Sequence, residues 1–278
     1  MCISILILTL NEERNILRCL ESVRWSDDIV VLDSGSTDRT VEIAERAGAR
    51  VVNRPFDNWA SHQNWANENI EFRYPWVYYS DADEIVTDEL RHEMVGTIAA
   101  PAVGCVAFRV RYKNYFMGRW IRHCGIYPVW VLRLFRPDKV AWTRLVNPVA
   151  VVAGQEGRLT AHFLHYSFNN GFEAWFAKHN RYSSQEAEET VKSLDGGSLD
   201  LRGLVSIRDP ARRRRALKEL SFRMPFRPSA RFIYMYFFRA GILDSYPGLV
   251  YCLLLAMYER MIVVKVMEIR RARKGLAI

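Results

Sequence analysis

The sequence predicts an α/β fold whose first part is a parallel sheet flanked by helices, and three observations predict it. Short apolar runs, each long enough for one buried strand, alternate with segments that repeat apolar residues at helical spacing. The first two of these runs end in polar loops rich in Asn, Asp, Ser or Thr. A later apolar run, 76–79, leads directly into Ser80-Asp81-Ala82-Asp83-Glu84. The alternation of strand and helix implies parallel strands joined by right-handed crossovers.

The first expected strand is 3–8, an apolar run interrupted only by Ser4. A polar segment follows, and then a helix with apolar residues at positions 16, 17, 20 and 23. We expect Asn11 to cap this helix, because an Asn side chain can accept a hydrogen bond from the exposed backbone N–H groups of the first turn. The acids Glu12 and Glu13 would then suit the helix dipole.

The second expected strand, 29–32, ends in the polar segment 33–38, which begins with Asp33. The next helix carries apolar residues at positions 41, 43, 44 and 47 and stops at Gly48. Residues 48–52 are expected to form a third strand. No Gly-x-Gly-x-x-Gly follows the first strand, so a dinucleotide-binding site has little support.

Asp81 and Asp83 follow the strand 76–79 and are the candidate metal ligands. Residues i and i+2 of an extended chain point the same way, so both carboxylates are expected to share one hard cation, Mg²⁺ or Mn²⁺. Ligands of open α/β sheets bind at the carboxyl edge, where the polar ends of the first two strands also lie. The sequence therefore predicts a nucleotide pocket there; the alternative is an acidic surface loop.

The later part of the chain predicts further strands and then helices. Residues 103–112 alternate apolar and polar side chains, as a half-buried strand does, and strands are also expected at 130–135 and 149–152. A helix is expected over 171–191, and a flexible break at 194–198. We therefore expect a catalytic domain over 1–170, with a nucleotide-sugar half at 1–100 and an acceptor half at 101–170, and a helical region over 171–278.

Three motifs carry a resemblance to a known family: TLNEERNILRCLES, VLDSGSTDRT and SDADE. In order, spacing and strand context they resemble the inverting glycosyltransferases of family 2. That resemblance implies a GT-A-type, Rossmann-like mixed sheet flanked by helices, here with a basic, amphipathic helical appendage at the C-terminal end. Further motifs, among them NYFMGRWIRH and YPVWVLRLFRP, resemble the branch that adds sugars to lipopolysaccharide core or to lipid-linked surface polysaccharides. The resemblance covers about residues 3–190.

The resemblance implies a metal-dependent transfer of a sugar from a nucleotide-diphosphate donor, with a UDP-sugar favoured, to a lipid-linked saccharide or lipopolysaccharide-core acceptor. Positions that match the uridine and ribose pocket of the family are Thr9, Asn11, Glu12 and Asp33. Asp33 at a strand end can accept a hydrogen bond from a base N–H group, although it could instead form the turn of its loop. Asp83 is the first choice as metal ligand, with Asp81 on the metal or the ribose.

Arg133 and Arg136 flank Phe135, and one of them is expected to contact the diphosphate, because a guanidinium matches phosphate geometry. The alternative is a solvated strand face. An inverting transfer also needs a base for the acceptor hydroxyl. Relatives commonly carry an acid where this chain has Val129, and His-Glu where it has Asn147-Pro148. Glu84 is the nearest remaining carboxylate, with His165 and His123 as further candidates.

Charge and cysteine content bear on location. Residues 202–239 hold eleven Arg or Lys against two acids, a net charge of +9, whereas the whole chain carries +8. Aromatic residues are interleaved with this block, which fits an interfacial segment on anionic lipid at the inner face of the cell membrane. No apolar run approaches the roughly twenty residues of a membrane span, and no signal peptide is expected. Five cysteines without a Cys-x-x-Cys pair suit buried thiols in a reducing cytoplasm.

The sequence is compatible with several alternatives. The basic region could be a homo-oligomer interface instead of a membrane surface, or both; no nucleic-acid motif accompanies it, so nucleic acid is not expected. The protein could bind a sugar nucleotide without catalysis, as a subunit or scaffold of a glycan assembly complex. A nucleotidyltransferase would need a Gly-rich, basic loop after the first strand, and the sequence has none. Metal-dependent donor hydrolysis would separate the transferase from the scaffold.

Overall fold

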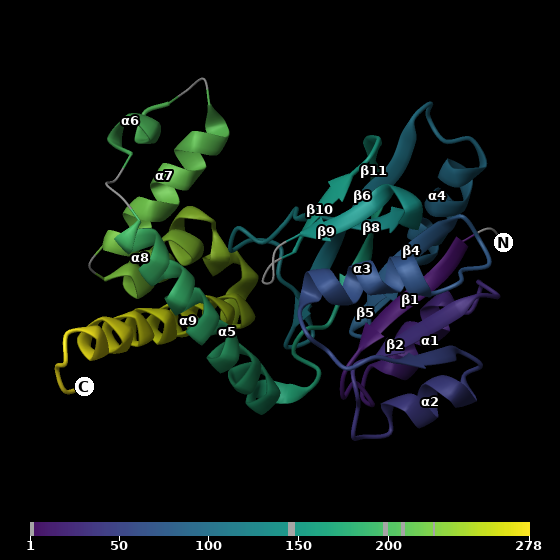
Figure 1. Cartoon of the computed structure of the whole chain (residues 1–278), viewed down its shortest axis with the longest axis horizontal. Coiled ribbons are helices and arrows are strands. Elements are labelled where there is room, and N and C mark those ends of the chain that lie inside the picture. Colours follow the sequence, from purple (N-terminus) through teal and green to yellow (C-terminus); the bar gives the residue numbers. More distant parts are fainter. Residues whose placement is uncertain (1–2, 144–147, 197–199, 207–208, 225) are drawn as a thin grey trace. The chain divides into compact units, whose positions relative to one another are not determined.

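The computed structural model describes residues 3–143, 148–196, 200–206, 209–224 and 226–278 (Figure 1). The chain forms two compact units, one comprising residues 1–122 and 126–170, the other comprising residues 123–125 and 171–278. The first is a mixed α/β unit and the second is helical. Among the described residues, no helix combines the length and the apolar character needed to cross a membrane.

The first unit is built on a mixed sheet with the strand order β3-β2-β1-β4-β8-β6-β11-β5. Four parallel strands make up its N-terminal half: β1 (Ile3–Thr9), β2 (Ile29–Asp33), β3 (Arg50–Asn53) and β4 (Trp76–Asp81). The other half consists of β5 (Glu84–Val86), β6 (Cys105–Phe116), β8 (Trp130–Phe135) and β11 (Gln155–His165). β8 pairs antiparallel with β4, which joins the two halves, and also with β6. β6 pairs parallel with β11. All four parallel strands therefore end at one edge of the sheet.

Smaller strands extend this framework. β7 (Arg119–Trp120) pairs with β6, and β9 (Val140–Thr143) pairs with β10 (Val149–Val152) in a separate two-stranded sheet. The helices of the unit are α1 (Ile16–Val23), α2 (Thr40–Arg46), α3 (Trp59–Asn69) and α4 (Asp88–Ala99), with a 3₁₀ turn, η1, at Pro137–Lys139.

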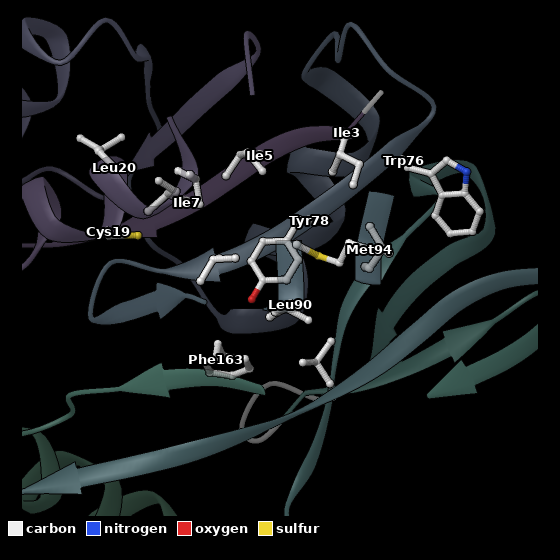
Figure 2. Packing of buried hydrophobic residues seen from close by; sticks show 14 of the residues in the cluster. Ile3, Ile5, Ile7, Cys19, Leu20, Trp76, Tyr78, Leu90, Met94 and Phe163 are labelled. Atoms are coloured by element: carbon white, nitrogen blue, oxygen red, sulfur yellow. The ribbon is translucent and has the colours of Figure 1, made fainter. Parts of the chain in front are cut away.

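Two hydrophobic clusters cover the two faces of the sheet. Ile3, Ile5 and Ile7 of β1 pack with α1, α2 and α4, whereas Leu6 and Leu8 pack with α3. β1 is buried on both faces, which explains why its sequence is almost entirely apolar. Figure 2 shows part of the first cluster, with Tyr78 of β4 close to Leu90 and Met94 of α4. Helices on both faces hold the strand ends in fixed positions.

The second unit is a group of helices. Its elements are α5 (Gly171–Asp195), α6 (Leu201–Leu204), α7 (Pro210–Arg223), α8 (Arg227–Ile233), a π-helical turn, η2 (Tyr234–Phe238), a 3₁₀ turn, η3 (Gly241–Asp244), and α9 (Ser245–Arg273). α9 packs against α5 and α8. Glu259 of α9 is buried and pairs with Arg227 at 2.7 Å and Arg231 at 3.1 Å, which ties α8 to α9. Lys265 of α9 donates to the backbone oxygen of Asn180 at 2.6 Å, which ties α9 to α5.

The predicted fold class is confirmed: a mixed sheet is flanked by helices, and a helical region with a long C-terminal helix follows. The strands expected at 130–135 and 149–152 have those bounds, and the helix expected over 171–191 continues to Asp195. Part of the break expected at 194–198 lies outside the described residues. The four described cysteines are buried and free.

Two local expectations are wrong. Asn11 does not cap the first helix: α1 begins at Ile16, its N-cap residue is Asn15, and the chain turns between them. Asn11 instead has a left-handed backbone with φ of 56°. Asp81 and Asp83 do not lie on one extended chain, because β4 ends at Asp81 and residues 82 and 83 form the turn into β5. Asp81 therefore lies at the end of a strand and Asp83 in a turn, so their carboxylates do not point the same way as a result of strand alternation.

Candidate active site

The polar loops after β1 and β2 are joined to each other by hydrogen bonds. The side-chain oxygen of Asn11 accepts from the backbone N–H of Thr37 at 2.8 Å, and the backbone N–H of Asn11 donates to the Ser36 hydroxyl at 2.8 Å. The backbone N–H of Glu12 donates to the Thr40 hydroxyl at 2.8 Å. The left-handed conformation of Asn11 makes these contacts possible, and Asn tolerates it better than most residues. These hydrogen bonds hold the loops after β1 and β2 against each other, and we call the two loops the braced loops.

Asp33 shapes the second of these loops from inside. Its carboxylate is fully buried and accepts from the backbone N–H groups of Gly35 at 2.9 Å and Ser36 at 2.8 Å, and from the Ser36 hydroxyl at 2.5 Å. Gly35 has φ of 93°, a conformation that favours glycine. This arrangement matches the turn-forming alternative for Asp33.

Thr9, at the end of β1, is also buried, and within the described part of the chain its hydroxyl has no hydrogen-bond partner. Buried hydroxyl groups are normally paired. The unpaired Thr9 hydroxyl at the carboxyl edge of the sheet is therefore suited to contact a bound ligand.

A second polar cluster lies where β4 meets β5 and β8. Arg133 of β8 is buried and donates from Nη2 to Asp81 Oδ2 at 2.8 Å and to Glu84 Oε1. The Tyr79 hydroxyl donates to Asp81 Oδ1 at 2.9 Å, and the Arg133 guanidinium lies over the Tyr79 ring, 4.5 Å from its centroid. The Asp81 carboxylate is thus held at both oxygens. Arg133 does not lie on a solvated strand face, so that alternative is wrong.

Glu84 is enclosed by this cluster. Its side chain is 2% exposed, and its second oxygen accepts from the backbone N–H of Asp81 at 3.3 Å. Burial raises the pKa of Glu84 above its usual range, an effect that the Arg133 charge opposes. Burial also lowers the pKa of Arg133, but the charges of Glu84 and Asp81 outweigh it, so this pKa is raised. The burial of Glu84 argues against its expected contact with an acceptor hydroxyl, because a base must reach the proton that it takes.

Asp83 extends from the turn in a different setting. Its side chain is 17% exposed, and Oδ2 lies 3.4 Å from Nε2 of His165 at the end of β11. Burial lowers the pKa of His165, but the charge and hydrogen bond of Asp83 outweigh this effect, so the pKa is raised. The backbone oxygen of Asp83 accepts from Tyr166 at 2.9 Å, which fixes the turn against the chain after β11. A shallow hollow beside Asp83 is lined by Asn15, Arg18, Tyr166 and Asn169.

The residues present fit a divalent cation that a ligand helps to hold. Asp81 and Asp83 supply carboxylate oxygens, the ligand type that Mg²⁺ and Mn²⁺ prefer. Among the described residues there is no group of three or more His, Cys, Asp and Glu placed to hold a metal ion. A closed protein cage is therefore absent from this part of the chain. Mg²⁺ sites of nucleotide enzymes commonly use one or two carboxylates and take the remaining ligands from phosphates and water.

The other sequence candidates have contacts of their own. Arg136 is half exposed and lies 3.4 Å from Asp138. His123 belongs to the second unit, where its Nδ1 lies 2.9 Å from Asp244. Asn147 lies outside the described residues.

Sequence reasoning missed His62 of α3, which is buried between Ser34 and Arg54. Its Nε2 lies 3.3 Å from the Ser34 hydroxyl, and its Nδ1 lies 2.6 Å from Arg54 Nη1. Burial and the Arg54 charge lower its pKa to about 4. His62 thus connects α3 to the loop after β2. The sequence pattern around a single histidine does not indicate a contact with a distant loop. The only available signal was its place in a polar segment, four residues after Asn58.

Comparisons with known proteins agree with the motifs of the first unit. The family model described as "Glycosyl transferase family 2" matches residues 4–155. The chain is 30% identical over 199 residues to the lipopolysaccharide core biosynthesis glycosyltransferase LpsC of Rhizobium meliloti, which covers 69% of this chain and 72% of that protein. It is also 30% identical over 208 residues to an uncharacterized glycosyltransferase of Rickettsia conorii, covering 68% of this chain and 71% of the relative.

Among solved structures, the chain is similar in part to glucosyl-3-phosphoglycerate synthase of Mycobacterium tuberculosis, crystallised with Mn²⁺, UDP and glucosyl-3-phosphoglycerate. The identity is 27% and the TM-score is 0.35. The matched region covers 40% of this chain and 44% of that one, less than half of either.

Proposed function

Because the chain belongs to glycosyltransferase family 2, we propose that it transfers a sugar, with inversion and with a divalent cation, from a UDP-sugar to a lipid-linked saccharide or lipopolysaccharide-core acceptor. The family assignment makes the protein a glycosyltransferase; the donor, metal and acceptor are the proposal. Similarity to LpsC over two thirds of both chains supports the acceptor class. The proposed catalytic domain is 1–170, and the proposed location is the inner face of the cell membrane.

The observation that carries the proposal is the convergence of polar groups on one sheet edge. The braced loops after β1 and β2 and the turn that holds Asp83 all follow the carboxyl ends of parallel strands. This edge is where open α/β sheets bind their ligands. Mg²⁺ or Mn²⁺ bound there would neutralise negative charge on the departing diphosphate.

Each residue of the edge has a role in this proposal. Asp83 binds the cation, and Asp81 contacts the cation or the ribose. Thr9, Asn11, Glu12 and Asp33 form the uridine and ribose pocket: the Thr9 hydroxyl is available to the ligand, while Asn11 and Asp33 fix the loops. Arg133 and Glu84 position Asp81 from the buried side of the site. Arg133 donates to the Asp81 carboxylate, and Glu84 accepts from the Asp81 backbone N–H.

A second candidate is a sugar-nucleotide-binding subunit without catalysis. It is favoured by Val129, where the family resemblance implies an acid, and by the burial of Glu84. The two candidates differ in turnover. A transferase hydrolyses its donor slowly when Mn²⁺ is present and transfers the sugar when a truncated lipopolysaccharide core is added. Donor binding without hydrolysis or transfer would favour the subunit.

A further inference from the structure

The second unit exposes an unusual concentration of large apolar side chains. Among the described residues from 226 to 243, six such side chains are at least half exposed, and we call them the apolar patch: Phe226, Tyr234, Phe237, Phe238, Ile242 and Leu243. Phe238 is 78% exposed and Phe226 is 77% exposed. Over the whole described part of the first unit, only Val103, Met117 and Val151 reach the same degree of exposure. Large apolar side chains exposed together within one short segment are suited to an interaction site.

The backbone holds the patch outward. The π-helical turn η2 places Phe237 and Phe238 on the surface while Met235 is buried. Such turns are frequent at functional sites. The next turn, η3, exposes Ile242 and Leu243.

Two buried residues anchor η3. A Cβ at Gly241 would lie 2.8 Å from Cys124 Sγ and 2.9 Å from the Met235 oxygen, so the backbone there is packed too closely for any side chain. Asp244 accepts from the backbone N–H of His123 at 2.8 Å. Because both ends of η3 are fixed, Ile242 and Leu243 cannot turn inward without breaking these contacts.

The charge around the patch selects its partner. Residues 226–243 contain three arginines and no acid. Arg227 and Arg231 share the single carboxylate of Glu259, and Arg239 is exposed beside Phe238, so the surface is positive. A symmetric contact with a second copy would bring the same positive surface against itself, which is unfavourable. An anionic bilayer offers hydrocarbon for the aromatic rings and negative headgroups for the arginines.

We propose that the apolar patch inserts into the interface of an anionic lipid bilayer and anchors the protein there without spanning it. Phe237, Phe238, Ile242 and Leu243 enter the boundary between headgroups and acyl chains, and Arg239 contacts the headgroups. Exposed Tyr234 suits the same boundary, since its ring is apolar and its hydroxyl is polar. Insertion of the patch does not depend on the sugar that is transferred or on the metal.

The test is co-sedimentation of the full chain with vesicles of phosphatidylglycerol and phosphatidylethanolamine, compared with vesicles of phosphatidylcholine alone. The variant Phe237→Ser/Phe238→Ser should bind the anionic vesicles at least about tenfold more weakly, because two aromatic side chains no longer leave water. The matched control Met117→Ser/Val151→Ser removes exposed apolar side chains from the first unit and should bind like the wild type. Equal binding by the patch variant would overturn the proposal.

A second variant reports insertion directly. Tryptophan fluorescence of Phe238→Trp should be quenched by brominated lipid in anionic vesicles, relative to the wild-type background, whereas that of Phe56→Trp should not. Equal quenching of both variants, or of neither, would contradict insertion of the patch.

Two further measurements separate membrane insertion from self-association and from a defect in the donor site. Sedimentation velocity without lipid should give the same mass for the wild type and for Phe237→Ser/Phe238→Ser. A wild-type dimer that this variant dissociates, with vesicle binding unchanged, would assign the patch to a second copy and overturn the proposal. UDP binding in the presence of Mn²⁺ should be equal in the variant and the wild type. If the wild-type protein binds UDP but no vesicles, membrane insertion is contradicted while the proposed donor site is not.

Discussion

Arg133 Nη2 lies 2.8 Å from Asp81 Oδ2, so the first carboxylate of the Asp-Ala-Asp sequence is hydrogen-bonded to the buried guanidinium of an arginine on a neighbouring strand. The same nitrogen donates to Glu84, whose burial leaves it dependent on that partner. The Asp81 carboxylate is therefore oriented before any ligand arrives. Asp83, in the turn beyond it, is approached by His165 at the longer distance of 3.4 Å.

Removal of Arg133 should destabilise the fold strongly. Arg133→Met should lower the free energy of unfolding by about 3–5 kcal/mol, because it leaves a buried carboxylate without its cation. Urea unfolding measures the change. The double variant Arg133→Met/Glu84→Gln should regain part of the loss, since the buried charge is gone. Arg136→Met, at a half-exposed ion pair, should cost less than about 1 kcal/mol. A mild effect of Arg133→Met would contradict the buried-pair account.

The brace between the two loops predicts a difference between two substitutions of Asn11. Asn11→Gly and Asn11→Ala both remove the bond to Thr37. Both residues must adopt the left-handed backbone at this position, which costs Ala about 1 kcal/mol more than Gly because Ala carries a Cβ. Thermal or urea unfolding should therefore rank wild type above Gly and Gly above Ala. UDP affinity should fall in both variants, because the loop edge loosens. An Ala variant as stable as the Gly variant would contradict the left-handed constraint.

His62 predicts a specific loss of stability in mild acid. Its pKa is about 4 in the folded protein against about 6.5 in the unfolded chain, so the unfolded state binds the proton first as pH falls. His62 therefore contributes stability that is complete above pH 6.5 and is lost progressively down to pH 4, by up to about 3 kcal/mol. His62→Gln should flatten this part of the profile when unfolding is measured across that pH range. His92→Gln, at an exposed histidine of α4, is the control. Parallel profiles for wild type and His62→Gln would refute the assignment.

The sequence predicted the four parallel strands β1 to β4 well, because each is a short apolar run with polar ends. It did not predict β11 (Gln155–His165), whose residues are of mixed polarity. Its predictions for single polar residues were less accurate, because these depend on contacts between segments far apart in the chain. Asn11 has the chemistry of a helix cap, but the loop after β2 offers it Thr37, and α1 begins later. Asp33 was equally ambiguous, and only the folded loop shows that its oxygens face the loop backbone.

The sequence also could not predict that the charged residues Glu84 and Arg133 are buried together. Glu84 is adjacent to Asp83 and was chosen as a base for that reason, yet β8 places Arg133 against it and encloses it. No pattern within residues 80–84 reveals a partner about fifty residues away. In the second unit, the sequence predicted a basic and aromatic region, but only the structure separates Phe237 and Phe238 on the surface from Met235 inside.

The central claim is that Asp83 and the braced loops bind a nucleotide diphosphate through a divalent cation. Calorimetric titration of the full chain with UDP, with and without Mn²⁺, tests it most directly. We predict binding that requires Mn²⁺ and that weakens by more than about a hundredfold in Asp83→Ala, since loss of an outer partner of a metal site alone costs up to that much. Asp88→Ala, at an exposed acid of α4, should bind like the wild type. Absence of binding under both conditions, or equal affinity in Asp83→Ala, would contradict the claim.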